Sequence, residues 1–150
     1  MTAQWVERVE SEGEQLALIV RAGFHEPGVH FFTPDHLSQQ LAHMRHPAGH
    51  VIEAHVHNPV RREVQYTQEV LILRRGRLRV DFYTPAGAYL LSSVLEAGDI
   101  ILLTSGGHGF EVLEEIEMIE VKQGPFIGAV DKRHIPGIAA ADVRVERSAG

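Results

Sequence analysis

The chain has 150 residues, of which 44% are apolar and 23% charged, a length and composition that suit one soluble domain with a hydrophobic core. Twenty Asp and Glu against fourteen Lys and Arg give a net charge of −6, which argues against a protein that binds nucleic acid through a basic surface. The absence of Cys excludes disulfides, thiolate metal sites and cysteine nucleophiles. The N-terminus lacks a signal-peptide pattern and no apolar run reaches about 18 residues, so we expect a cytoplasmic protein that does not enter a membrane.

Short apolar runs, separated by turn residues about every ten positions, predict an all-β sandwich or barrel with little helix. In chain order, the expected strands cover residues 15–21, 70–74, 78–84, 100–104 and 116–122. Residues 78–82 alternate between apolar and polar, as in a strand with one buried face. The dipeptides Arg-Gly at 75–76 and Ala-Gly at 86–87 predict hairpin turns, because each offers a Gly where the backbone needs a positive φ.

One short segment has two interpretations. A helix capped by Thr33 could begin at Pro34, but we favour a short turn followed by a strand over residues 39–45. No composition break, repeat or low-complexity segment divides the chain. We therefore expect a single domain over residues 1–150, with a loosely held tail of small residues over 136–150.

Histidine is the unusual residue of this sequence, with ten in all and five between His43 and His57. In the stretch His55-Val56-His57, two imidazoles lie at positions i and i+2, which on a strand point to the same face about 6.6–6.8 Å apart. Two imidazoles at that spacing can bind one metal ion. Such a pair arises often by chance in a His-rich chain, so its context carries more weight than the pair itself.

The context adds glycines and two further ligands. Gly49 precedes His55 by six residues, and Glu69 stands before an apolar run and seven residues ahead of Gly76. His108 follows a later apolar run. Three imidazoles and one carboxylate form a donor set suited to Fe, Mn, Zn, Ni or Cu. The four candidate ligands are His55, His57, Glu69 and His108.

At these residues the chain resembles the cupin superfamily. The first cupin motif reads Gly-x5-His-x-His followed by Glu-x6-Gly, and the second is matched in part between Gly98 and His108. The resemblance spans roughly residues 49–121 and implies a double-stranded β-helix, the cupin jelly-roll barrel, with a core at about residues 39–125 and a 3-His/1-Glu metal centre. Three shorter stretches look like a group of small single-domain bacterial cupins: residues 65–70, 106–111 and 121–125.

The spacing leaves the identity of the carboxylate open between two residues. Eleven residues separate His57 from Glu69, where the family usually has three or four, so Glu63 is an alternative ligand. We favour Glu69 because it heads an apolar strand. Thr104 stands where the second motif has Pro, and no Asn follows His108 at the family position.

Four further residues are candidates for catalysis or binding. Glu53 has the same strand parity as the two histidines, so it could accept a hydrogen bond from a ligand imidazole or act as a general base; a surface carboxylate is the alternative. Tyr66 lies near Glu69 and is a second candidate acid or base. Arg61 and Lys122 could pair with an anionic group of a substrate. For Arg61 the alternative is a solvent-exposed loop residue with no role in binding, which is the more common case.

The first functional hypothesis is a metal-dependent enzyme. It would hold one divalent transition metal per chain, Fe, Mn, Zn or Ni, and act on a small polar molecule such as a sugar derivative or carboxylic acid, as an isomerase, epimerase or dioxygenase. The alternative is a non-enzymatic cupin that binds or senses a small ligand, and a metal-free barrel is the third interpretation. The resemblance also implies a homodimer, to which residues 15–21 could contribute an edge strand.

Overall fold

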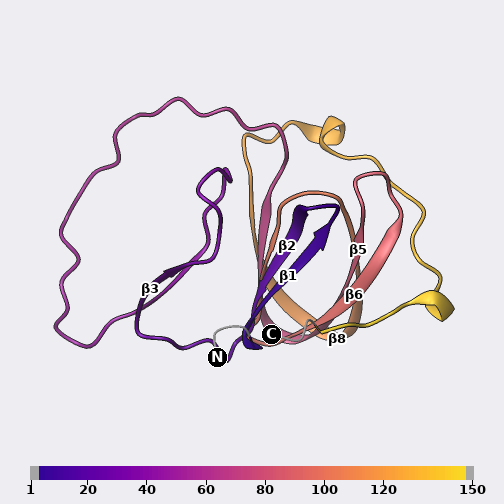
Figure 1. Ribbon diagram of the computed structural model, residues 1–150, viewed down its shortest axis with the longest axis horizontal. Helices are drawn as coiled ribbons and strands as arrows, with labels where there is room; N and C mark the ends of the chain where they lie inside the picture. Colours follow the sequence, from indigo (N-terminus) through magenta and orange to yellow (C-terminus); the bar gives the residue numbers. More distant parts are fainter. Residues whose placement is uncertain (1–3, 148–150) are drawn as a thin grey trace. The chain divides into compact units, whose positions relative to one another are not determined.

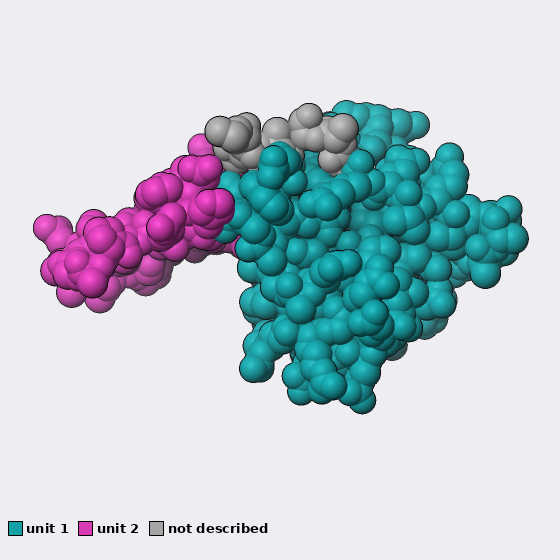
Figure 2. Space-filling view, turned by 90° about the horizontal axis from the view of Figure 1, so that it is seen from below, with its two compact units in different colours: residues 1–24, 66–150 teal, residues 25–65 magenta. Residues whose placement is uncertain are grey.

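The computed structural model of the protein describes residues 4–147. Its regular structure consists of β-strands and short 3-10 helices, with no α-helix among these residues, so the all-β prediction is confirmed. Within the same range, no helix has the length and apolar character that crossing a membrane requires. The chain divides into two compact units, unit 1 (residues 1–24 and 66–150) and unit 2 (residues 25–65), which Figure 2 colours separately.

Unit 1 is built on one six-stranded antiparallel sheet. Its strands are β1 (Val6–Ser11), β2 (Glu14–Val20), β5 (Glu69–Tyr83), β6 (Tyr89–Glu96), β7 (Ile100–Leu103) and β8 (Gly107–Lys122). The order is β1-β2-β7-β5-β6, and β8 pairs with the other side of β5. Because β2 lies between β1 and β7, the expectation that residues 15–21 form an edge strand is wrong.

The β5–β8 pair is a long ribbon that curls and gives the sheet the form of a half-barrel (Figure 1). Its register shifts three times between residues 73 and 78. Gly76 lies within this irregularity with φ of 84°, and a Cβ at this position would collide with the carbonyl oxygen of Glu115. Bulges of this kind increase the local twist and bend the strand, so Gly76 permits the curl.

The hairpin turn expected at residues 75–76 is therefore wrong, because both residues lie inside β5. A bulge and a tight turn require the same positive φ, and the local sequence does not distinguish them. The turn expected at residues 86–87 is confirmed: it joins β5 to β6, and the N–H of Gly87 donates to the carbonyl of Thr84 at 2.8 Å.

The hydrophobic core of unit 1 lies against one face of this sheet. On β5, the residues of the hydrophobic core cluster are at odd positions before the bulge, 71 and 73, and at even positions after it, 78, 80 and 82. Side chains alternate between faces along a strand, so the bulge changes which parity faces the core. The apolar face predicted over residues 78–82 is confirmed, with Leu78, Val80 and Phe82 at most 1% exposed, but the other face is not open to solvent, since Asp81 is 6% exposed. Each such burial contributes about 1.5–3 kcal/mol.

Unit 2 contains a two-stranded hairpin of β3 (Gly28–Phe31) and β4 (Ala42–Arg45). The turn and strand favoured for this region are confirmed, since turns and bends follow Pro34 and β4 lies within the range expected for the strand. Residues 46–65 form neither helix nor strand, and all of them except His46 are exposed. A strand through His55 and His57 is therefore not observed, since this segment has no ladder partner among the described residues.

The C-terminal segment includes η2 (Gly128–Asp131) and η3 (Ala140–Asp142). Beyond η3, the N–H of Ser92 in β6 donates to the carbonyl of Arg144, and the N–H of Glu146 donates to the carbonyl of Ser92, both at 2.8 Å. A parallel bridge between Ser92 and Val145 results. Part of the expected tail is thus hydrogen-bonded to β6, and residues 148–150 lie outside the described residues.

Candidate metal centre

Glu69, His108 and Lys122 form one polar group in unit 1, which we call the Glu69 cluster. Oε2 of Glu69 lies 3.5 Å from Nε2 of His108, and Oε1 of Glu69 lies 3.1 Å from Nζ of Lys122. Glu69 itself is 9% exposed, whereas the side chains of His108 and Lys122 are 31% and 34% exposed. The carboxylate is therefore nearly buried, and its two partners separate it from solvent.

The curl of the β5–β8 ribbon brings this cluster together. Lys122 lies opposite Glu69 in the ladder, so their contact follows from the strand register. His108 lies instead opposite Phe82, thirteen residues further along β5. In a straight strand that separation is roughly 43 Å, at ~3.3 Å per residue. Glu69 and His108 meet because the curled ribbon returns one end towards the other (Figure 1), which makes the bulge at Gly76 a determinant of the site.

The electrostatics of the cluster favour a charged carboxylate. The contact with His108 lowers the pKa of Glu69 to about 2, with help from the ammonium group of Lys122 and against burial, which raises it. The carboxylate in turn raises the pKa of Lys122. Glu69 is therefore ionised throughout the physiological pH range, and both of its oxygens have partners.

Asp131 and Thr67 extend the cluster. Oδ2 of Asp131 lies 4.0 Å from Nζ of Lys122, and the hydroxyl of Thr67 donates to Oδ1 of the same carboxylate. Lys122 is thus placed between two carboxylates, one from β5 and one from η2. Sequence reasoning did not single out Asp131, because a lone Asp in a loop, far along the chain from Glu69, has no local pattern that marks it.

His55 and His57 belong to unit 2, where both are exposed. Their rings make an edge contact, with centroids 5.2 Å apart and planes at 79°. Nδ1 of His55 lies 2.8 Å from the carbonyl oxygen of Glu53. Because a carbonyl oxygen can only accept, Nδ1 carries the proton, and the neutral ring then has its lone pair on Nε2, as in many metal-ligating histidines. Glu53, expected to assist through its carboxylate, contacts His55 through its backbone.

The other predicted site residues are exposed. Glu53, Arg61 and Glu63 lie in unit 2, and Tyr66 in unit 1 is 68% exposed. Among residues 4–147 their side chains make no ion pair or hydrogen bond. Over the same part of the chain, no three His, Asp or Glu side chains are grouped so that they could hold a metal ion. The structure brings Glu69 to His108 and, separately, His55 to His57.

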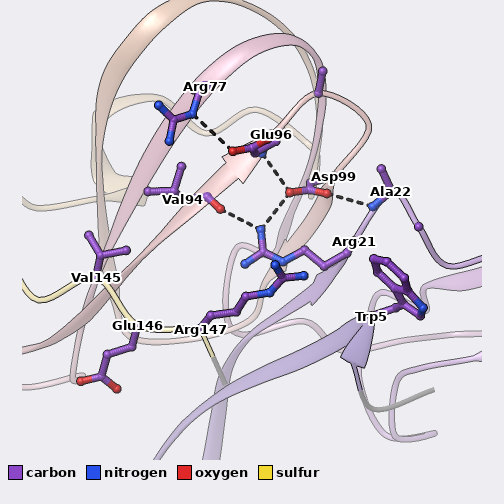
Figure 3. Close-up of a pocket in the computed structure, with 12 residues that line it drawn as sticks. Trp5, Arg21, Ala22, Arg77, Val94, Glu96, Asp99, Val145, Glu146 and Arg147 are labelled. Atoms are coloured by element: carbon purple, nitrogen blue, oxygen red, sulfur yellow. Dashed lines mark hydrogen bonds and ion pairs between the residues drawn. The ribbon is translucent and has the colours of Figure 1, made fainter. Parts of the chain in front are cut away.

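A hollow of about 460 Å³ lies elsewhere in unit 1, lined in part by Arg21 (Figure 3). Arg21 donates to Glu7 and to Asp99, each at 2.8 Å, and to the carbonyl of Val94 at 2.7 Å. All three charged residues are less than 10% exposed. Internal partners occupy these donors and acceptors, and they tie β1 and β2 to the β6–β7 connection. This network is structural, since removing one member would leave a buried charge unpaired.

The chemistry available for function is therefore that of a carboxylate, imidazoles and an amine. Carboxylate and imidazole are the ligand types that first-row divalent metals share. Glu69 and His108 supply one of each in unit 1, and His55 and His57 supply two imidazoles in unit 2. No model of a protein family, no curated protein and no solved structure matches this chain significantly.

Proposed function

We propose that the protein is a metal-binding barrel of the cupin type with one divalent transition metal per chain, Fe, Mn, Zn or Ni. It binds or acts on a small polar molecule rich in oxygen, such as a sugar derivative or a carboxylic acid. The proposed ligands are His55, His57, Glu69 and His108. The observation that carries the proposal is the contact between Glu69 and His108, two ligand types at positions that are far apart along the β5–β8 ribbon.

The donor set fits a metal ion. Bonds of ~2.1 Å at tetrahedral angles place two ligand atoms about 3.4 Å apart, and Nε2 of His108 lies 3.5 Å from Oε2 of Glu69. Metal ligands must be deprotonated; the lowered pKa of Glu69 meets this requirement for the carboxylate, and a metal ion would replace the hydrogen-bond proton between it and Nε2 of His108. In unit 2, the neutral tautomer of His55 that donates through Nδ1 offers Nε2 to a metal ion.

The proposal extends to the fold and the assembly. A double-stranded β-helix contains more sheet than the half-barrel of unit 1 supplies, so further strands would have to complete it. A homodimer remains part of the proposal. In unit 1, the sheet edges without a strand partner among residues 4–147 are β1, the side of β8 that does not pair with β5, and the outer side of β6, which has only the isolated bridge at Ser92. Unpaired edges are the usual sites of strand addition by a second chain.

When bound, the metal supplies Lewis-acid polarisation of an oxygen atom of the substrate. The chain's own contribution is to orient that molecule. Lys122 is one-third exposed and lies beside Glu69, so its ammonium group could pair with an anionic substituent of the substrate. The carboxylate of Asp131, 4.0 Å from Nζ, would hold Lys122 in place. Arg61 is a second candidate cation for this role.

Proton transfer would need an acid or base that is not a ligand. Glu53 and Tyr66 are the candidates, and both are exposed. Neither is fixed by a side-chain partner among residues 4–147. This lack of a positioned acid or base favours the alternative function, a cupin that binds or senses a small ligand without turnover.

Elemental analysis of untagged protein, purified without a chelator, tests the proposal. We expect one transition-metal ion per chain in the wild type, and loss of most of it in H55A, E69Q and H108A. E63Q is the matched control, because Glu63 is an exposed carboxylate in unit 2. Loss of metal in E63Q with retention in E69Q would assign the carboxylate to Glu63 and overturn the assignment made here.

The identity of the metal then selects the activity assay. Iron directs the search to O₂ consumption, and zinc, nickel or manganese to isomerase and epimerase substrates. Ligand binding without turnover would establish the alternative function. Protein that contains no metal, and takes up none from Fe²⁺, Mn²⁺, Ni²⁺ or Zn²⁺, would overturn the proposed centre.

A further inference from the structure

Unit 2 contains more histidine than one metal centre can use. Eight of the ten histidines of the chain lie between residues 25 and 65, and the proposed centre takes only two of them. His46 and His50 stand out among the remainder because their rings are stacked, with centroids 4.1 Å apart and planes at 9°.

A tight turn holds the two rings together. The N–H of His50 donates to the carbonyl of Pro47 at 3.2 Å, and Gly49 has φ of 87°. A positive φ at the third position of a turn is the type II pattern, which Gly adopts without strain. Since the turn closes the chain between His46 and His50, their side chains leave the backbone close to each other.

Both rings are accessible and have nitrogens to offer. His50 is exposed and His46 is partly exposed. Neither ring makes a hydrogen bond or ion pair among residues 4–147, and the two rings stack on each other. Two nitrogens bound to one ion at ~2.1 Å and right angles are about 3.0 Å apart. The lone pair of an imidazole nitrogen lies in the plane of its ring, so the two rings would have to rotate out of the observed stack for both nitrogens to face one ion.

We propose that His46 and His50 form a second metal site, a two-imidazole chelate for a divalent transition metal such as Ni²⁺, Cu²⁺ or Zn²⁺. Imidazole suits these ions, and water completes their coordination. The site is independent of the centre formed by His55, His57, Glu69 and His108. It uses two ligands instead of four, so it binds its ion more weakly and exchanges it more readily.

Nickel titration of the full chain tests this site. The titration is done in the H55A/H57A background at pH 7.5, so that the centre proposed above does not contribute and its failure would not affect the result. We expect one equivalent of Ni²⁺ to bind, as measured by calorimetry. Adding H46A or H50A should weaken this binding about 100-fold, because a chelate makes the second ligation intramolecular. H46A and H50A should weaken the binding to a similar extent.

His36 provides the matched control, because it is an exposed histidine of unit 2 without a ring partner among residues 4–147. Adding H36A should leave nickel binding unchanged, and circular dichroism should show that all variants keep the strand signal. Nickel binding that is equally affected by H36A, H46A and H50A would mean that single histidines bind separately, and would overturn the chelate. Binding unchanged by H46A and H50A would overturn it as well.

Discussion

Glu69 carries its charge at a nearly buried position because an imidazole and an ammonium group accompany it. Burial alone would raise its pKa, and the contacts with His108 and Lys122 reverse that effect. The same contacts keep the carboxylate ready to receive a metal ion at neutral pH. In metal-free protein they stabilise the fold, and this contribution depends on pH.

We expect E69Q to change how the stability of metal-free protein depends on pH. A carboxyl whose pKa is lower in the folded chain stabilises the fold above its unfolded pKa, near 4.5, and this stabilisation is lost as the pH falls towards 2. Because both partners are about one-third exposed, we expect about 1–3 kcal/mol at pH 7. Urea unfolding of chelator-treated protein should show E69Q less stable at pH 7 and the difference shrinking between pH 4.5 and 2.

E63Q serves as the control for this measurement, because Glu63 is exposed and has no ion-pair partner among residues 4–147. Its stability should follow that of the wild type at every pH. A constant difference between wild type and E69Q from pH 7 to pH 2 would contradict the lowered pKa, since the lost interaction would then not involve the charge.

Among the strands, β5 and β8 show where sequence reasoning stops. Residues 70–74 and 78–84 were predicted as two strands, and they are two parts of β5 because Gly76 forms a bulge and not a turn. The partner β8 was recognised only over residues 116–122. Three strands were not predicted: β1 reads Val-Glu-Arg-Val-Glu-Ser, β3 has only four residues, and two serines interrupt the apolar run of β6. Short or largely polar strands need their ladder partners to be identified.

Charge pairs explain why residues 111–115, in the part of β8 that was not predicted as a strand, include three glutamates. Arg75 lies 3.5 Å from Glu115, Arg77 lies 3.7 Å from Glu114, and Arg79 lies 2.5 Å from Glu111. The pairs of Arg75 and Arg77 are exposed, and each contributes at most about 1 kcal/mol. Together they match the basic part of β5 to the acidic part of β8, so that cross-strand charge complementarity supports the register around the bulge.

G76A should destabilise the protein more than a glycine substitution with the same backbone requirement. Gly13 is the matched control, because its φ of 82° is similar to the 84° of Gly76 and a Cβ there would have nothing within 4 Å. We expect G13A to cost about 1 kcal/mol of unfolding free energy. G76A should cost about 1–3 kcal/mol more, because its Cβ collides with the backbone of Glu115. Chemical denaturation of both variants measures this difference.

The site offers a second measurement of the same change. If the bulge is what brings His108 to Glu69, G76A should also lower the metal content of the purified protein, while G13A should leave it unchanged. Equal losses of stability in the two variants, with equal metal content, would show that the ribbon curls without Gly76.

For the whole molecule, spacing along the sequence was enough to select Glu69 and His108 for one site, and the structure places them 3.5 Å apart. This selection used only the order and spacing of residues along the chain, which can be read from the sequence. Asp131 was not selected, because its contact with Lys122 depends on the path of the C-terminal segment. His55 and His57 were selected as a strand pair, and they lie in a segment without a strand. Whether they join Glu69 and His108 on one ion is a prediction that protease accessibility can test.

Trypsin should cut metal-free protein first after Arg61 or Arg62, because residues 46–65 are exposed and have no strand or helix to resist the protease. Saturation with the metal that elemental analysis identifies should slow this cut, since ligation of His55 and His57 would restrain the segment. H55A should be cut at one rate with or without metal, whereas H46A should still be protected. Mass spectrometry of timed samples identifies the first fragments.

Wild-type protein cut equally fast in both states would show that the two histidines do not belong to the proposed centre. A first cut within β5 or β8 would contradict the exposure of residues 46–65.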